Sequence, residues 1–269
     1  MPELPEMETY RRLLQERVGG RAITATLVQR EKTINLDPAQ FDRILVGNRI
    51  TLVDRCAKHL LFHLESGHVL LLHLMLGGFL YYGTGEDKLG RTAQVTISFG
   101  QPILYFHGLR LGYLHLLTAG QLDERLDSLG PEPLDAAFTL SRFTELLADK
   151  RGILKTTLVD QHWLSGIGNC YSDEICFDAQ ILPTRRIPEL SQEEIKRLYH
   201  SMQKVLKEAI QYGGYMEPPL YRDDHLTGGF NDRCQVYDRG GEPCLRCGQP
   251  IIQSKLSSRK VFACTNCQH

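Results

Sequence analysis

Four of the eight cysteines are gathered near the end of the chain as two C-x-x-C pairs, and this spacing strongly restricts the local fold. Cys244 and Cys247 form the first pair, and Cys264 and Cys267 form the second. Each pair offers two thiolates on a tight turn, and the segment between them is long enough for a β-hairpin. Four thiolates complete the tetrahedral shell of Zn²⁺ and leave no open position for water. We therefore predict one structural Zn²⁺ in a β-hairpin finger over residues 233–269.

The predicted finger carries more basic than acidic side chains. From residue 233 onward, six basic residues stand against two acidic ones, a local balance of +4. Lys255, Arg259 and Lys260 lie in the segment expected to form the hairpin. A solvated surface module accounts for this pattern, and so does a hairpin that binds nucleic-acid phosphates. Zinc ribbons also mediate protein contacts, so the spacing alone leaves the partner open.

The rest of the chain has an ordinary globular composition. Its 269 residues favour more than one domain, and 42% of them are hydrophobic. The net charge of −1 gives no overall basic field toward nucleic acid. The acidic start is unlike a signal peptide, and no apolar run is long enough for a bilayer. We therefore expect a cytoplasmic protein with reduced cysteines, in which Cys56, Cys170, Cys176 and Cys234 are small buried residues.

Residues 21–117 contain repeated short β-rich runs, punctuated by Gly, Asn, Asp and Ser. A helix is predicted before them over residues 3–18, because apolar residues recur at helical spacing and Gly19-Gly20 ends the pattern. Short strands at this spacing predict an antiparallel β-sandwich or barrel. The predicted strands cover residues 22–28, 49–53, 59–64, 69–74, 79–82, 93–98 and 103–106.

The apolar period becomes helical after a linker at residues 129–133. Ser191 and Glu194 form a capping box at the start of the clearest helix. Helices are predicted over residues 139–150, 152–158, 171–179 and 191–212, followed by a loop over residues 215–233. The predicted fold class is α+β. It comprises an N-terminal antiparallel β-sandwich domain with an N-terminal helix (1–130), a helical domain (131–232) and the finger (233–269).

The chain begins Met1-Pro2-Glu3-Leu4-Pro5-Glu6. If Met1 is removed, Pro2 presents a secondary amine, a nucleophile that can attack carbon and form an iminium (Schiff base) intermediate. Glu3 and Glu6 place carboxylates beside that amine, where they can transfer protons. The same residues also suit a helix start, since Pro is favoured at the first position and acids in the first turn. The two interpretations are compatible, and the sequence does not separate them.

In this order, the N-terminal Pro-Glu, the β-rich half, the helical half and the four-cysteine finger resemble the formamidopyrimidine-DNA glycosylase / endonuclease VIII family. The resemblance runs nearly end to end. Its most specific parts are residues 2–6, Lys58 within Arg55-Cys56-Ala57-Lys58-His59-Leu60, Asp160-Gln161 followed by residues 166–174, and the finger with Arg259. The resemblance implies a helix–two-turn–helix in the helical domain.

The resemblance also implies a base-excision DNA repair enzyme with glycosylase and AP lyase activity. Pro2 would attack the sugar C1′ of a damaged nucleotide and displace an oxidised or ring-opened purine. Strand cleavage by β,δ-elimination would follow. Glu3 would be the acid/base, Glu6 would support the geometry of both residues, and Lys58 would contact phosphate near the lesion. Without the resemblance, Lys58 is interpreted as a surface lysine.

The resemblance further implies a set of DNA contacts. Asn169, in the turn of the helix–two-turn–helix, and Arg259, in the finger, would bind phosphates. For the stretch that contains Asn169, the structural alternative is an ordinary interhelical turn. Lys155 and Tyr237 match family positions near the DNA.

The regions next to the lesion depart from the family pattern. The enzyme must rotate the damaged nucleotide out of the stack, and Leu76 and Arg110 would fill the space left behind. Leu76 stands where the family carries Met, and the loop of Arg110 lacks the usual Phe, with Leu111 nearest. Tyr215 and Met216 replace the Ser/Thr that usually follow the double glycine. These changes spare the nucleophile, so we expect retained activity with an altered lesion preference.

Two competing functions remain open. A non-catalytic or altered-specificity family member would bind bulky or distorted DNA lesions. A zinc-ribbon module for protein contacts would show no salt-dependent affinity for duplex DNA. A catalytic zinc hydrolase is disfavoured because four cysteines leave no open metal position. From the resemblance we expect a monomer that acts on double-stranded damaged DNA at the bacterial nucleoid, with no membrane partner.

Overall fold

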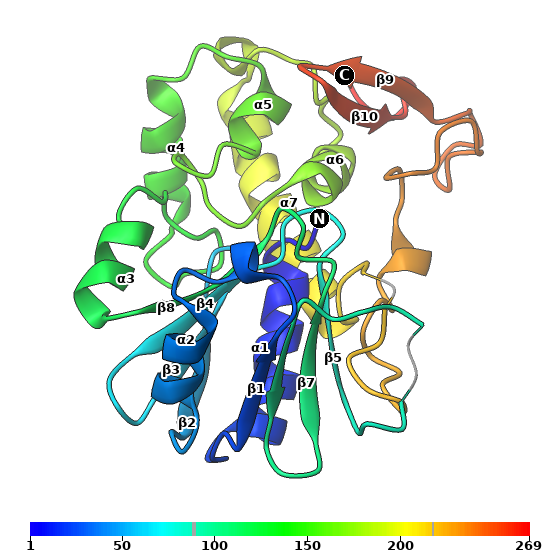
Figure 1. Ribbon diagram of the computed structural model, residues 1–269. Helices are drawn as coiled ribbons and strands as arrows, with labels where there is room; N and C mark the ends of the chain where they lie inside the picture. The colour runs from blue at the N-terminus through cyan, green and yellow to red at the C-terminus, as the bar shows by residue number, and fades with distance from the viewer. Residues whose placement is uncertain (88–89, 217) are drawn as a thin grey trace. The chain divides into compact units, whose positions relative to one another are not determined.

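The computed structural model describes residues 1–87, 90–216 and 218–269 (Figure 1). The chain forms two compact units. The first contains residues 1–128 and 212–229, and the second contains residues 129–211 and 230–269. These units differ from the three expected segments, because residues 212–229 group with the β-rich unit and the finger groups with the helical one.

The described part of the first unit contains two four-stranded antiparallel sheets together with helices. This arrangement confirms the predicted α+β class with an N-terminal sandwich. One sheet has the order β1-β6-β7-β5, with bounds Ala25–Val28, Val95–Ser98, Ile103–His107 and Phe79–Gly83. The other has the order β2-β3-β4-β8, with bounds Ile50–Cys56, His59–Leu64, Val69–His73 and Tyr113–Leu117.

Helix α1 (Leu4–Val18) shares one hydrophobic core with both sheets. Its buried Met7 and Tyr10 belong to the same cluster as Phe62 of β3 and Phe106 of β7. The two phenylalanine rings pack edge to face, with centroids 6.5 Å apart. Each large apolar side chain buried in this way stabilises the fold by about 1.5–3 kcal/mol. The core therefore fixes α1, and with it the first residues of the chain.

Two helices of the first unit lie outside the predicted elements. Helix α2 (Pro38–Leu45) interrupts the stretch predicted as strands, and α3 (Ala119–Leu126) follows β8. Asp37 caps α2 by accepting the N–H of Ala39 at 2.9 Å, and Pro38 occupies its first turn. The sequence analysis predicted only strands within residues 21–117, so helix α2 is a correction. Short 3₁₀ turns lie at Glu31–Thr33, Ile187–Glu189 and Asn231–Arg233.

The second unit combines helices with the finger hairpin (Figure 1). Ser191 and Glu194 form the predicted capping box before the longest helix, with the Ser191 N–H donating to Glu194 Oε2 at 2.7 Å. The helices are α4 (Leu140–Ala148), α5 (Leu154–Leu158), α6 (Asn169–Asp178) and α7 (Gln192–Gln211), and the hairpin consists of β9 (Ile252–Leu256) and β10 (Arg259–Ala263). No helix within the described ranges is long and apolar enough to span a membrane.

Buried carboxylates attach the finger to α6. Glu174 accepts the backbone N–H groups of Gln235, Val236 and Tyr237 at 2.8–3.1 Å. Asp173 accepts the N–H of Phe262 in β10 at 3.1 Å. Hydrogen bonds to a charged acceptor are stronger than those between neutral groups. The finger is therefore fastened to the helices rather than attached by a linker.

Candidate active site and nucleic-acid interface

The start of α1 brings Pro2, Glu3 and Glu6 together, all of them buried. The Glu6 carboxylate accepts the backbone N–H of Glu3 at 2.7 Å and so takes part in a capping box. The helix-cap interpretation of these acids therefore holds. The same contact fixes the Glu3 backbone directly after Pro2, so capping and a reactive N-terminus are compatible.

Glu6 also joins the helix start to the loop over residues 212–229. Its Oε1 atom accepts the backbone N–H of Tyr215 at 2.9 Å. The preceding residue, Gly214, has a φ of +73°, and a Cβ there would overlap the Glu6 carboxylate. Glycine is required for this close approach, because other residues disfavour positive φ and would add the clashing atom. The double glycine thus places Tyr215 beside the N-terminus.

A pocket of about 230 Å³ opens beside Pro2. It is lined by Met1, Pro2, Gly77, Gly78, Phe79, Arg91, Tyr215, Met216 and Pro218. The Tyr215 hydroxyl donates to the Met1 carbonyl oxygen at 2.8 Å and accepts from the Met1 amine at 3.3 Å. The sequence marked Tyr215 only as a departure from the family pattern. Tyr215 lies in a loop more than 200 residues from Met1 in the sequence. No local spacing reveals that these two residues are in contact.

Lys58 is presented by a two-residue turn between β2 and β3 and is itself buried. Ala57 adopts a φ of 51° in this turn. Arg55 supports the turn by donating to the Ala57 carbonyl at 3.1 Å, and its Nε also lies 3.2 Å from Glu8 of α1. Burial alone would raise the pKa of Glu8, but hydrogen bonds from Arg11 and neighbouring guanidinium groups outweigh it and lower the pKa to about 2. This ionised carboxylate ties the lysine turn to the helix that carries Pro2.

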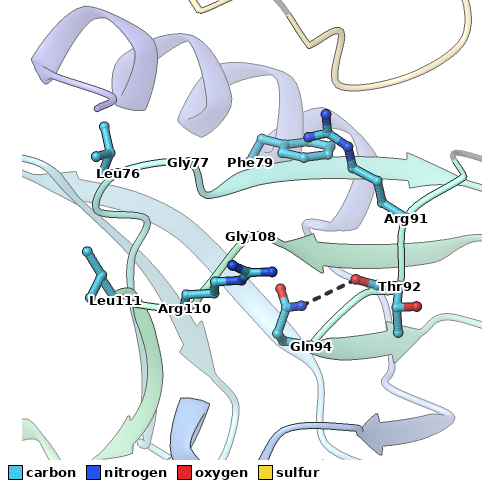
Figure 2. Close-up of a pocket in the computed structure, with 9 residues that line it drawn as sticks. All are labelled: Leu76, Gly77, Phe79, Arg91, Thr92, Gln94, Gly108, Arg110 and Leu111. Atoms are coloured by element: carbon cyan, nitrogen blue, oxygen red, sulfur yellow. Dashed lines mark hydrogen bonds between the residues drawn. The ribbon is translucent and has the colours of Figure 1, made fainter.

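A larger cleft, of about 730 Å³, is lined in part by the two loops predicted to act at the lesion (Figure 2). Leu76 and Leu111 line it and are 67% and 65% exposed. Arg110 points toward Gln94 (Figure 2). Gly108 has a φ of +69°, and a Cβ there would overlap the carbonyl of Gly77, so the two loops touch through glycine. The geometry brings two exposed apolar tips and one arginine to the same cleft.

The remaining predicted DNA-contact residues lie in the second unit. Asn169 begins α6, and Lys155 of α5 donates to its carbonyl oxygen at 3.2 Å. Lys155 is buried and forms an ion pair with Asp173. Its ammonium is thus engaged inside the protein. The role of Lys155 near the DNA stays a prediction.

The finger presents Arg259 at its surface. This exposed residue begins β10, directly after Ser257 and Ser258, whose φ values are 46° and 67°. Tyr237 is half-buried, and its ring packs edge to face on Phe262 with centroids 5.5 Å apart. Arg259 therefore has its guanidinium available to a ligand, while Tyr237 is held against the finger core.

The four finger cysteines converge as predicted. Their Sγ atoms all lie within 4.8 Å of one another. Cys244 and Cys267 Sγ are 3.9 Å apart, and Cys247 and Cys264 Sγ are 3.5 Å apart. Tetrahedral Zn²⁺ with Zn–S bonds of about 2.3 Å requires S···S separations of about 3.8 Å. The four thiolates and their spacing fit a metal ion with tetrahedral coordination.

Known proteins match this chain over most of its length. The model of the formamidopyrimidine-DNA glycosylase N-terminal domain matches residues 1–114, and that of the formamidopyrimidine-DNA glycosylase H2TH domain matches residues 129–217. The chain belongs to the formamidopyrimidine-DNA glycosylase family. The formamidopyrimidine-DNA glycosylase of Thermus thermophilus is 39% identical, covering 100% of this chain and 98% of that protein. That of Moorella thermoacetica is 38% identical, covering 93% of each.

Solved structures of the formamidopyrimidine-DNA glycosylase family share the fold. The Lactococcus lactis Fpg (MutM) in complex with DNA containing N7-benzyl-Fapy-dG has a TM-score of 0.91 and 30% identity, covering 99% of each chain. The MutM (Fpg) protein of Thermus thermophilus has a TM-score of 0.86 and 36% identity, covering 99% of this chain and 98% of that one. This chain is therefore a DNA glycosylase of the DNA repair class, and the resemblance found in the sequence is confirmed.

Proposed function

We propose that the chain is a base-excision repair glycosylase with AP lyase activity that uses Pro2 as its nucleophile. The observation that carries this proposal is the buried start of α1, where Pro2 borders a pocket and lies beside the carboxylates of Glu3 and Glu6. An amine next to buried acids can both attack carbon and exchange protons. The substrate class is an oxidised or ring-opened purine in double-stranded DNA, in line with the lesion-containing DNA bound by similar proteins.

The proposed reaction begins with removal of Met1, which frees the Pro2 nitrogen. The nitrogen lone pair forms a bond to C1′ while the bond from C1′ to the base breaks, and the base leaves with that electron pair. Loss of the Pro2 proton and cleavage of the C1′–O4′ bond then give the iminium, with O4′ taking a proton from Glu3. The iminium acidifies the C2′ proton, so β- and then δ-elimination cleave the strand. Glu6 acts by holding Glu3 and the loop in place.

Both units supply DNA contacts in this proposal. Lys58, on its hairpin turn, is assigned to phosphate near the lesion, and Asn169 and Arg259 are assigned to the flanking phosphates. Lys155 supports the turn that bears Asn169, because its ammonium donates to the Asn169 carbonyl oxygen. Tyr237 supports the finger face. The four cysteines would hold one Zn²⁺, which supplies a fixed fold for the finger and no chemistry.

The cleft loops suggest an altered lesion preference. Leu76, Leu111 and Arg110 would occupy the gap left by the extruded nucleotide, with Arg110 facing the orphaned base. Leucine wedges and the Tyr215-Met216 pair change the walls around the lesion but leave Pro2 and Glu3 intact. Rates on duplexes with 8-oxoguanine, formamidopyrimidine, oxidised pyrimidine and bulky alkyl lesions test this. Cleavage of 8-oxoguanine opposite cytosine as fast as by an ordinary family member would refute the altered preference. We further propose a monomer acting at the bacterial nucleoid.

Borohydride trapping tests the proposed chemistry. Borohydride reduces an iminium to a stable covalent protein–DNA adduct, so the wild-type protein should be trapped on an abasic-site duplex. Pro2→Gly should abolish the adduct, and intact-mass analysis should find Met1 absent from the active protein. Undiminished trapping by Pro2→Gly, or an active protein that retains Met1, would contradict the assignment of the nucleophile. Binding without any adduct would favour a non-catalytic damage-binding protein.

A further inference from the structure

The Tyr215 hydroxyl contacts Met1, the residue bonded to the proposed nucleophile. It donates to the Met1 carbonyl oxygen at 2.8 Å, and this carbonyl carbon is bonded directly to the Pro2 nitrogen. The same hydroxyl oxygen accepts from the Met1 amine at 3.3 Å. A phenolic hydroxyl can donate one hydrogen bond and accept others at the same time. Tyr215 thus contacts both polar groups of the residue that processing removes.

The Met1–Pro2 peptide has the connectivity of the proposed covalent adduct. In the peptide, the Pro2 nitrogen is bonded to a carbon that carries an oxygen. In the adduct before the sugar ring opens, the Pro2 nitrogen is bonded to C1′, which carries O4′. The Met1 carbonyl carbon therefore stands in for C1′, and the carbonyl oxygen stands in for O4′. A hydroxyl that donates to the first oxygen is positioned to donate to the second.

The position of Tyr215 is fixed by its backbone. Its N–H donates to Glu6 Oε1 at 2.9 Å, and Glu6 Oε2 accepts from the Glu3 N–H at 2.7 Å. The positive φ values of Gly213 and Gly214, +76° and +73°, allow the loop to approach this carboxylate. The Glu6 side chain therefore sets the backbone position of both Glu3 and Tyr215. A donor held in advance requires no reorganisation when charge develops on the substrate.

We propose that Tyr215 is a catalytic residue that donates a hydrogen bond to the sugar ring oxygen as the C1′–O4′ bond breaks. This inference rests on the proposed function. The electron pair of the breaking bond moves to O4′, the Pro2 lone pair forms the C1′–nitrogen double bond, and Glu3 delivers the proton that O4′ gains. Tyr215 keeps its own proton throughout and lowers the barrier by stabilising the charge that develops on O4′.

Tyr215→Phe tests this role, because it removes the hydroxyl and keeps both the ring and the backbone bond to Glu6. Single-turnover borohydride trapping on an abasic-site duplex is the readout, since this substrate is independent of lesion preference. Loss of one preorganised donor to a developing oxyanion costs about 10²-fold or more in rate. We expect trapping to slow by about 10-fold to 100-fold, because Glu3 still acts. Affinity for a duplex with the unreactive tetrahydrofuran analogue should stay within about twofold.

Tyr221→Phe is the matched control, because Tyr221 lies in the same loop and its ring packs under the Arg17 guanidinium instead. It should trap at the wild-type rate. If Tyr215→Phe also traps at that rate, while Pro2→Gly gives no adduct, this inference fails and the proposed function stands. A parallel loss of trapping and of tetrahydrofuran affinity would equally overturn it, since Tyr215 would then act in binding. If the wild-type protein forms no adduct, the proposed function and this inference fall together.

Discussion

The Lys155 ammonium lies 2.6 Å from the Asp173 carboxylate, and neither side chain exposes more than 1% of its surface. Burial raises the pKa of the Asp173 carboxyl, whereas the Lys155 charge and the Phe262 N–H oppose that rise. The pair joins α5 to α6, and through Phe262 it reaches strand β10 of the finger. An ion pair inside the protein thus connects the turn that bears Asn169 with the hairpin that bears Arg259.

Lys155→Met should strongly destabilise the second unit. The substitution leaves the Asp173 carboxylate buried without its partner, which costs about 3–5 kcal/mol of unfolding free energy. Lys204→Met is the matched control, because Lys204 and Asp178 are also 2.6 Å apart but their side chains are 64% and 24% exposed. An exposed pair contributes about 0–1 kcal/mol. Chemical denaturation of both variants provides the measurement.

The same two variants also distinguish a supporting role of Lys155 inside the protein from direct contact between Lys155 and DNA. If Lys155 contacts a phosphate instead, its loss should reduce the salt dependence of DNA affinity by about one counterion. Equal and small destabilisation by the two substitutions, together with such a change, would argue against the supporting role. Double replacement of Lys155 and Asp173 by apolar residues should recover part of the stability, since neither charge of the buried pair remains.

The sequence predicted the elements whose signals are local. The strand β3, the helix α7 with its Ser191–Glu194 box and the cysteine cluster follow from periodicity, capping and metal-ligand spacing. Helix α2 was missed because only Phe41 and Leu45 are buried, too few for a visible period, although Asp37-Pro38 is a helix-start signal.

The site was predictable only where a motif is contiguous. Pro2, Glu3 and Glu6 adjoin in sequence and in space. Tyr215 reaches them only because two glycines with positive φ let a distant loop approach Glu6. The burial of Lys155 was equally hidden, since lysine is seldom fully buried and its partner lies on another helix. Long-range packing, rather than local propensity, decides both cases.

Two histidines in the sandwich should make the first unit sensitive to acid. His59 and His73 lie with ring centroids 4.5 Å apart. Burial and nearby charges lower the pKa of His59 to about 4, and burial, His59 and Lys58 lower the pKa of His73 to about 3. In the unfolded chain these groups bind protons below their ordinary pKa of 6.5, whereas the folded protein keeps them neutral. The free energy of unfolding should therefore be highest above pH 6.5. It should fall toward pH 4 by about 1.4 kcal/mol per pH unit for each histidine.

His73→Phe should flatten this decline, because it keeps a ring beside Tyr113 and removes one titrating group. Melting temperatures measured from about pH 7.5 to about pH 4.5 give the slope. The exposed His225→Gln substitution serves as the control and should follow the wild-type curve. A His73→Phe slope equal to the wild-type slope would show that other groups govern acid unfolding.

Metal removal should unfold the finger and leave the helices intact. We expect one Zn²⁺ per chain by elemental analysis, because the four thiolates form a closed site. Cys247→Ser should lose the metal and expose β9 and β10 to limited proteolysis, since binding energy at such sites is folding energy. Far-ultraviolet circular dichroism should retain the helical signal. A metal-free wild-type protein whose hairpin resists protease would contradict this expectation.

Ser258→Gly should stabilise the turn of the finger hairpin. Ser257 and Ser258 both adopt positive φ, 46° and 67°, as the central residues of a two-residue hairpin of the primed type require. A non-glycine residue there costs about 1–2 kcal/mol, and glycine loses part of that gain through its greater unfolded-state freedom. We expect a net gain of about 0.5–1 kcal/mol, seen as slower hydrogen exchange at the paired amides of β9 and β10.

Ser254→Gly gives the opposite sign and completes the comparison. Ser254 lies in β9 opposite Val261, in an extended conformation that any residue adopts. Glycine in a regular strand is destabilising by about 0.5–1 kcal/mol, so exchange should accelerate. The same residue change would then protect the hairpin at the turn and weaken it within the strand. If both variants shift exchange in the same direction, the backbone conformation of the turn does not control hairpin stability.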